Sequence, residues 1–135
     1  QAKHLIWERL RQLQAQGKTL ILTTHFMDEA ERLCSRLAII DHGKIVAQDS
    51  PVGLIAQHIE PQVIEVFGDG AAIWAQEHAA QVCQRFEVVG ETIFCYAQQA
   101  DSLLGALQSS GLRYLHRQAN LEDVFLKLTG RDLRD

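Results

Sequence analysis

The sequence lacks several features that would place it in a specialised class of protein. It contains only two prolines in 135 residues, which excludes collagen-like and proline-rich chains. Its three cysteines, Cys34, Cys83 and Cys95, are widely spaced and form neither a metal-binding pattern nor an even-numbered disulfide set. No apolar run approaches the roughly 18–20 residues that cross a bilayer, so we expect no membrane insertion. With no disulfide framework, the cytoplasm is the expected compartment.

Basic residues are also scarce relative to acidic ones. Lys and Arg total 13 against 17 Asp and Glu, which gives a net charge of −4 at pH 7. Proteins that bind nucleic acids usually carry a basic excess, so we expect no nucleic-acid partner. Hydrophobic residues make up 47% of the chain and charged residues 22%, values typical of globular domains.

The two prolines divide the chain into two parts. Pro51 and Pro61 stand close together, and proline removes a backbone donor and fixes φ. The net negative charge lies entirely after this point. We therefore predict a boundary at about residue 60, with one domain portion over residues 1–60 and a second domain over 61–135.

The apolar pattern of residues 1–57 predicts a helix, a strand, a helix, two strands and a helix. These elements are a helix over 1–16, a buried parallel strand over Thr19–Thr24, a helix over 26–33, hairpin strands over 37–41 and 44–48, and a short helix over 51–57. Ile6, Leu10 and Leu13 form the expected apolar side of the first helix. A parallel strand needs partner strands that this segment does not contain. The segment therefore has the pattern of part of an α/β domain.

Residues 20–46 closely resemble the end of the nucleotide-binding domain of an ABC transporter. A strand ends at His25, and a helix with the acidic residues Asp28, Glu29 and Glu31 follows it. A second strand, a turn through Gly43 and Lys44, and a third strand come next. The resemblance, which extends over about residues 1–57, implies that His25 is the switch histidine that senses the γ-phosphate of ATP. From position alone, His25 could instead cap the next helix.

The motifs that bind phosphate and magnesium in that family are missing. The sequence contains no Walker A loop, no signature motif and no Walker B strand with its catalytic glutamate. Gly17-Lys18-Thr19 imitates the end of a Walker A loop, but Gln12 stands where the pattern requires glycine. We therefore expect no ATP hydrolysis, no cofactor and no metal for this chain alone. The resemblance implies ATP and Mg²⁺ as cofactors of the intact family domain.

Residues 61–135 predict the order β-α-β-β-α-β followed by an extra helix, which is a ferredoxin-like arrangement. The expected elements are a strand over 62–67, a helix over 71–84, strands over 85–89 and 92–97 joined by a tight turn at Gly90-Glu91, a helix from Asp101 closed by Gly111, a strand over 112–117, and a helix capped by Asn120. The overall prediction is a mixed class, α/β then α+β: a partial ABC-ATPase α/β subdomain followed by a ferredoxin-like domain.

Three features of this second part have a structural interpretation, and two of them also have a functional one. Phe94 and Tyr96 alternate along a strand, and they could stack a ligand or pack against the sheet. Glu122 and Asp123 open a helix, where carboxylates complement the helix dipole, and a catalytic pair is the alternative. The last helix carries an apolar stripe of the kind that packs in a core. That stripe consists of Leu121, Val124, Phe125 and Leu128.

Residues 121–130 also resemble the closing segment of ABC ATPases that export drugs and nodulation factors. The leading interpretation is thus the C-terminal part of such an exporter subunit, with 61–135 as an accessory or regulatory domain. A stand-alone interaction or dimerisation module is the alternative, and a small-molecule sensor is a third. The resemblance implies a transmembrane permease as partner, and a position at the inner face of the cell membrane stays open. A homodimer is expected from the unpaired edges of Thr19–Thr24 or from an open sheet face.

Overall fold

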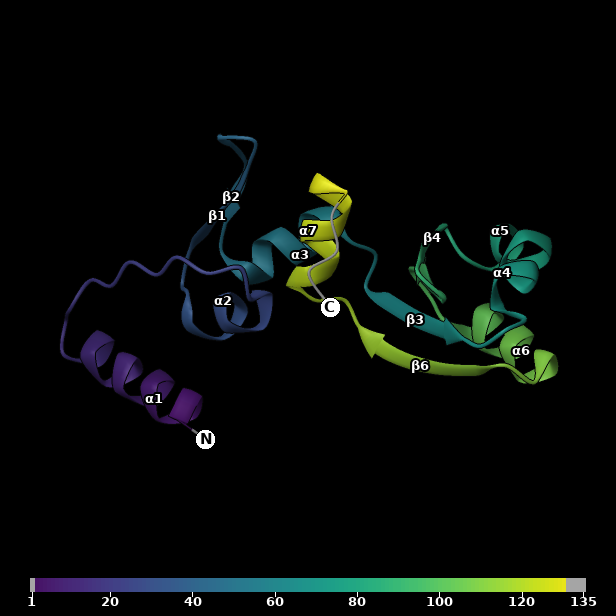
Figure 1. Ribbon diagram of the computed structural model, residues 1–135, viewed down its shortest axis with the longest axis horizontal. Helices are drawn as coiled ribbons and strands as arrows, with labels where there is room; N and C mark the ends of the chain where they lie inside the picture. Colours follow the sequence, from purple (N-terminus) through teal and green to yellow (C-terminus); the bar gives the residue numbers. More distant parts are fainter. Residues whose placement is uncertain (1, 131–135) are drawn as a thin grey trace.

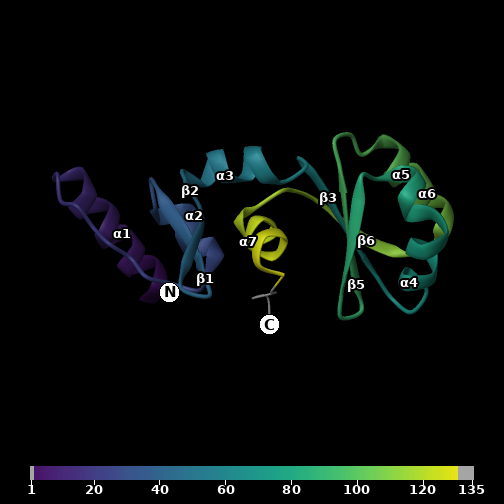
Figure 2. The ribbon, with the colours of Figure 1, turned by 90° about the horizontal axis from the view of Figure 1, so that it is seen from above.

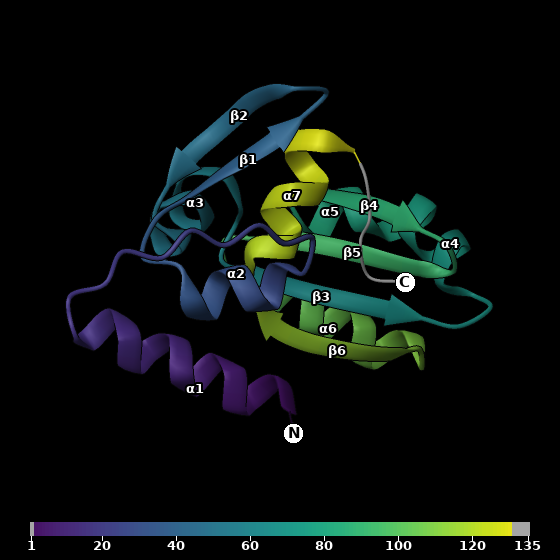
Figure 3. The same cartoon turned by 60° about the vertical axis from the view of Figure 1, so that its left-hand side comes forward.

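A four-stranded antiparallel sheet forms the centre of the C-terminal half. The computed structural model describes residues 2–130 and places the strands in the order β4-β5-β3-β6, as Figure 3 shows. These strands are β3 (Gln62–Phe67), β4 (Arg85–Val89), β5 (Thr92–Ala97) and β6 (Arg113–Gln118). All neighbouring strands run antiparallel. With a helical connection after β3 and another after β5, this is the β-α-β-β-α-β order, so the predicted ferredoxin-like arrangement is confirmed.

Helices cover one face of this sheet (Figure 2). The stretch predicted as one helix consists of α4 (Ala71–Trp74), the π-helical turn η1 (Ala75–Ala79) and α5 (Ala80–Val82). The second helix, α6 (Asp101–Ser110), ends at Gly111, whose φ of 76° is the left-handed conformation expected of a helix-capping glycine. These helices and the sheet enclose one apolar core. Its sheet members are Ile64, Val66, Ile93, Cys95 and Ala97, and its helix members include Trp74, Ala79, Leu103 and Leu107.

The opposite face of the sheet is covered too, by the last helix, α7 (Leu121–Thr129), and by apolar residues of the N-terminal half. Val63, Phe94 and Tyr96 point to this side and are buried in a second apolar core. The expectation of an open sheet face was therefore wrong, because the C-terminal helix folds back across the sheet. Packing is the confirmed interpretation of Phe94 and Tyr96.

The N-terminal half consists of helices around a two-stranded hairpin (Figure 1). Its elements are α1 (Ala2–Ala15), α2 (Met27–Leu33), β1 (Leu37–Asp41), β2 (Lys44–Asp49) and α3 (Pro51–His58). The hairpin turn has positive φ at both His42 (51°) and Gly43 (74°), as a two-residue type I′ turn requires. Ser50 caps α3, because its Oγ accepts a hydrogen bond from the Gly53 amide at 3.0 Å.

The predicted parallel strand over Thr19–Thr24 was wrong. Residues 18–24 form no regular element, and Ile21 is 95% exposed. A strand exists only when its backbone groups pair with those of a neighbour, and no strand of residues 2–130 pairs with this segment. The segment therefore has the apolar composition of a strand without the pairing that would make it one. Both sheets formed by residues 2–130 are antiparallel.

The first helix packs through a residue that lies outside its predicted apolar side. Trp7 is the buried residue of α1, and its Nε1 donates to Glu29 Oε2 at 3.2 Å. Ile6, from the predicted stripe, is exposed, and Leu10 and Leu13 are half-buried. One amphipathic aromatic side chain, rather than an aliphatic stripe, thus attaches α1 to α2. Within residues 2–130 no helix combines the length and the apolar character that crossing a membrane requires.

Replacing Gly90 with valine should lower the free energy of unfolding by about 1–2 kcal/mol. Gly90 has a φ of 61° at the first turn position between β4 and β5, and nothing lies near a Cβ placed there. The expected cost is therefore conformational. The matched control is Gly105→Ala in α6, where φ is not positive and space is also open; it should stabilise by about 0.5–1 kcal/mol. Urea unfolding followed by circular dichroism measures both, and equal effects would contradict the assigned turn.

Candidate functional site

His25, the residue singled out from the sequence, lies just before α2. Its side chain is exposed, and its ring stacks on Phe26 with the ring centroids 4.2 Å apart. Thr24 Oγ1 accepts a hydrogen bond from the Phe26 amide at 3.0 Å, which fixes the backbone on both sides of His25. The His25 side chain does not cap α2, since the helix has no side-chain cap. The imidazole is therefore free to face a ligand.

A pocket of about 370 Å³ lies beside His25. Its walls come from residues 22–25, α2, β1 and α7. Most of the lining is apolar, and Thr23, Thr24 and His25 supply polar groups on one side. Leu121 and Phe125 of α7 complete the pocket, so the C-terminal helix and the predicted site residue share one cavity.

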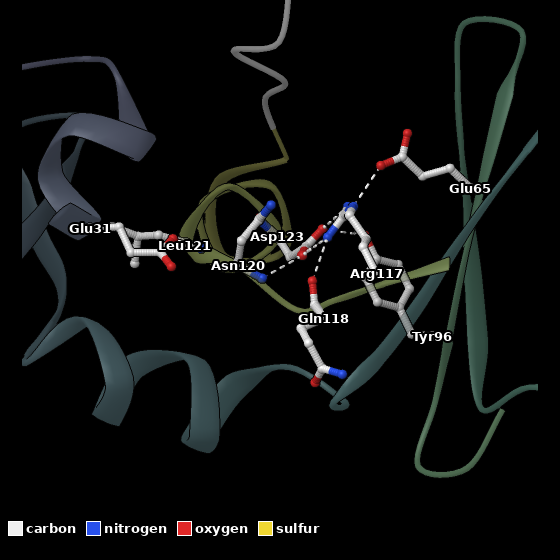
Figure 4. A network of polar contacts seen from close by, with 8 residues as sticks. All are labelled: Glu31, Glu65, Tyr96, Arg117, Gln118, Asn120, Leu121 and Asp123. Atoms are coloured by element: carbon white, nitrogen blue, oxygen red, sulfur yellow. Dashed lines mark hydrogen bonds and ion pairs between the residues drawn. The ribbon is translucent and has the colours of Figure 1, made fainter. Parts of the chain in front are cut away.

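A network of charged side chains surrounds the start of α7 (Figure 4). Asp123 is completely buried, and both of its carboxylate oxygens accept hydrogen bonds from Arg117, at 2.7 and 2.9 Å. Arg117 Nε also donates to Glu65 Oε2 at 2.6 Å, which connects β6 with β3. Burial alone would lower the pKa of Arg117, but the hydrogen bonds and charges of Asp123 and Glu65 outweigh it and raise that pKa. Arg117 is therefore a permanent cation between two carboxylates.

Asp123 has a second role at the helix terminus. Asn120 Oδ1 accepts from the Asp123 amide at 3.1 Å, while Asp123 Oδ2 accepts from the Asn120 amide at 2.9 Å. This reciprocal pair is a capping box. Tyr96 OH adds a 3.4 Å hydrogen bond to Asp123 Oδ1 from strand β5. The same carboxylate thus caps the N-terminus of α7, pairs with the charge of Arg117 and contacts the sheet.

The network extends into the N-terminal half through Glu31. Its Oε1 accepts a hydrogen bond from the amide of Leu121, the first residue of α7, at 2.9 Å. Glu31 belongs to α2, which begins two residues after His25. A carboxylate at a helix N-terminus is stabilised by the helix dipole. One short path of direct contacts therefore joins the segment of His25, α2, α7 and the sheet.

Sequence reasoning found parts of this arrangement and missed others. The Asn120 cap is confirmed, and of the two interpretations of Asp123 the structure bears out the helix-terminal one. The ion pair of Asp123 with Arg117 was missed. The sequence signal that could have indicated it is a basic residue near the end of a strand, a few residues before an acidic residue in the first turn of the next helix. Within residues 2–130, no three His, Cys, Asp or Glu side chains form a cluster able to hold a metal ion.

Comparison with known proteins gives a consistent similarity along the chain. Residues 72–130 match the family model described as "Nodulation factor export protein NodI, C-terminal domain". All of the chain aligns with proteins named "Nod factor export ATP-binding protein I". These are 54% identical in Ralstonia nicotianae, 55% in Paraburkholderia xenovorans and 54% in Cupriavidus pinatubonensis, and the chain covers 44%, 44% and 42% of their respective lengths.

The chain thus spans less than half the length of the curated relatives that it matches. The matched family model is that of a C-terminal domain. The predicted resemblance to the C-terminal part of an ATP-binding subunit of the nodulation-factor exporter type is therefore confirmed.

Proposed function

We propose, from the similarity of the whole chain to nodulation-factor export ATP-binding proteins, that residues 1–135 act as the C-terminal part of an exporter ATP-binding subunit. In this proposal residues 1–60 complete a nucleotide-binding domain, and residues 61–135 form an accessory or regulatory domain. The observation that carries the proposal is identity above 50% over the entire chain.

His25 is the residue of this chain that would contact nucleotide. Its exposed imidazole, held between Thr24 and Phe26, supports a role in hydrogen-bonding the γ-phosphate of bound ATP. ATP and Mg²⁺ would be held by phosphate-binding groups that this sequence lacks. The chain by itself is then no ATPase, and His25 acts only within a complete nucleotide-binding domain.

Exposed apolar side chains around the segment of His25 support contact of this surface with another part of a nucleotide-binding domain. Ile40 and Ile45 of the hairpin are 63% and 61% exposed. Ile21, in the irregular segment 18–24, and Phe26, directly before α2, are exposed as well. Exposed apolar groups gathered in this way are typical of a surface that another part of the assembly covers. We assign them to contact with the rest of the nucleotide-binding domain. The intact subunit would work with a transmembrane permease, at the cytoplasmic face of the membrane.

The contacts of α7 support a regulatory role for the accessory domain. Glu31 links α2 to the N-terminus of α7, and Arg117 links α7 to the sheet. A displacement of α2 when His25 engages phosphate would therefore reach the sheet through α7. Coupling between two sites requires an element whose contacts differ between two states of the protein, and α7 is placed to be that element.

A chimera tests the proposal. Residues 1–135 would replace the aligned part of the Ralstonia nicotianae relative, and ATP turnover would be measured in the purified chimera. We expect turnover in the chimera, none in the isolated chain, and a loss of at least about tenfold on His25→Ala, the size of effect that removal of a group acting on a transferring phosphate produces. His78→Ala, at an exposed helix position, is the matched control and should leave turnover unchanged. Turnover by the isolated chain, or an active His25→Ala chimera, would refute the proposal.

The alternative function, a dimerisation module, rests on the same exposed apolar surface. In the absence of the rest of an ATP-binding domain, two copies of the chain would cover that surface by associating. Light scattering at micromolar concentration should give twice the chain mass of 15.2 kDa. Ile40→Lys together with Ile45→Lys should return the monomer, while Val88→Lys, at an exposed site on the distant strand β4, should not. A monodisperse 15.2 kDa species for the unmodified chain would exclude this alternative.

A further inference from the structure

Two of the three cysteines lie in the core between the sheet and helices α4 to α6, on the face of the sheet opposite the site described above. Cys95, on β5, is fully buried, and Cys83 follows the last turn of α5 and packs against the same core. The two thiols face each other closely enough that each shifts the pKa of the other. Cys83 Sγ also donates to the carbonyl of Ala79, the last residue of the π-helical turn, at 3.0 Å. The sulfur atoms are therefore neighbours held in place from two sides.

Cys83 is open to solvent where Cys95 is not. It lines an open groove of about 430 Å³ whose other walls are almost entirely polar. Those walls consist of Gln81, Val82, Gln84, Gln98, Gln99 and Ser102. A small polar molecule in this groove therefore lies against Cys83, while Cys95 is closed to solvent.

The surroundings also favour the anion of Cys83. Contact with the Cys95 thiol lowers the pKa of the Cys83 thiol, and the backbone of Tyr96 and Arg85 adds to this. Burial and the charge of Glu60 oppose the shift without reversing it. The third cysteine, Cys34, is half-buried like Cys83, but burial and the charge of Glu29 raise its pKa. Because the thiolate is the reactive form, only Cys83 combines access with reactivity.

We propose that Cys83 and Cys95 are a peroxide-oxidisable pair, in which Cys83 is the reacting thiol and Cys95 the resolving thiol. The Cys83 sulfur attacks one oxygen of hydrogen peroxide, an S–O bond forms as the O–O bond breaks, and hydroxide leaves. Cys83 is oxidised to sulfenic acid and the peroxide is reduced. The Cys95 sulfur then attacks the Cys83 sulfur, and the S–O bond breaks. The departing oxygen takes the Cys95 proton and leaves as water, and an intrachain disulfide remains.

The pairing explains how a buried thiol can complete the reaction. Contact with the Cys83 thiol, burial and the charge of Cys83 together raise the pKa of Cys95. Cys83, which lines the groove, is therefore the thiol that peroxide oxidises first, and the fully buried Cys95 acts second.

Peptide mapping of the full chain tests the proposal, since trypsin places each cysteine on its own peptide. Cys34 lies in residues 33–36, Cys83 in 45–85 and Cys95 in 86–113. After treatment with hydrogen peroxide and blocking of free thiols, we expect peptides 45–85 and 86–113 joined, with a mass lower by two hydrogen atoms than their sum. Peptide 33–36 should stay reduced, so that Cys34 is the internal control.

Two variants separate the roles of the two thiols. In Cys95→Ala the sulfenic acid on Cys83 has no resolving partner, and we expect it to accumulate and to be trapped by a 1,3-diketone reagent. In Cys83→Ser neither Cys95 nor Cys34 should react under the same conditions. Oxidation of Cys34 as fast as Cys83, a disulfide between two chains, or sulfenic acid in the unmodified chain that never joins Cys95 would overturn the proposal. If Cys95→Ala does not fold, the map of the unmodified chain decides alone.

Discussion

Replacing Arg117 with methionine is expected to lower the free energy of unfolding by about 3–5 kcal/mol, because it leaves a buried charge without its partner. Asp123 is completely buried and receives two of its hydrogen bonds from Arg117. Methionine fills a similar volume but supplies neither charge nor donors. Urea unfolding followed by circular dichroism measures the loss.

Two further variants establish the cause of that loss. Arg113→Met removes an exposed guanidinium from the same strand and should change stability by less than about 0.5 kcal/mol. Asp123→Asn in the Arg117→Met background removes the stranded charge and should restore part of the lost stability. If the double variant is no more stable than Arg117→Met, the buried charge is not the cause.

Replacing Leu121 with alanine is expected to cost about 2–5 kcal/mol, the range for a fully buried leucine. Leu121 is inaccessible to solvent and packs in the core that α7 shares with α2, α3 and the sheet. Truncation therefore enlarges the pocket beside His25 that Leu121 lines. Leu5→Ala is the matched control, because Leu5 is largely exposed on α1, and it should cost less than about 0.5 kcal/mol.

The course of unfolding adds a second readout for Leu121→Ala. The residue contacts elements on both sides of the predicted boundary near residue 60, so both halves should lose stability together. A variant in which only one half melts earlier would contradict the shared core and favour two independent domains.

The sequence predicted best those elements whose conformation is decided locally. The turn at Gly90, the turn through Gly43 and the caps at Ser50 and Asn120 all depend on residues a few positions apart, and each occurs in the structure. Such signals are reliable because the same residue supplies both the conformation and the hydrogen bond.

The errors concern contacts between distant parts of the chain. Thr19–Thr24 has the composition of a strand, but composition cannot provide a neighbouring strand. Trp7 is buried against α2, where Glu29 accepts its indole hydrogen, and the periodicity around Ile6 contains no sign of that partner. Helix α7 was predicted correctly in extent, yet its position across the sheet depends on the fit of Val63 and Leu121 in a common core. Tertiary packing of this kind decides the face an element buries without changing its local pattern.

The same limit applies to the candidate site. His25 was found through a resemblance, and its role stays a prediction. The pair of Arg117 and Asp123 could not be found from spacing, because a strand and a helix separated by a short turn can meet at many angles. Only the folding of α7 across the sheet brings the carboxylate to the guanidinium.

The burial of the two tryptophans gives each half of the molecule its own intrinsic fluorophore. Trp7 is 4% exposed where α1 meets α2, and Trp74 is 7% exposed in the core between α4 and the sheet. Because the chain has two tryptophans, Trp7→Phe and Trp74→Phe each leave a single emitter. The emission of Trp74 reports the sheet domain, and the emission of Trp7 reports the docking of the first helix. Opening of one end of the molecule can thus be distinguished spectrally from melting of the whole.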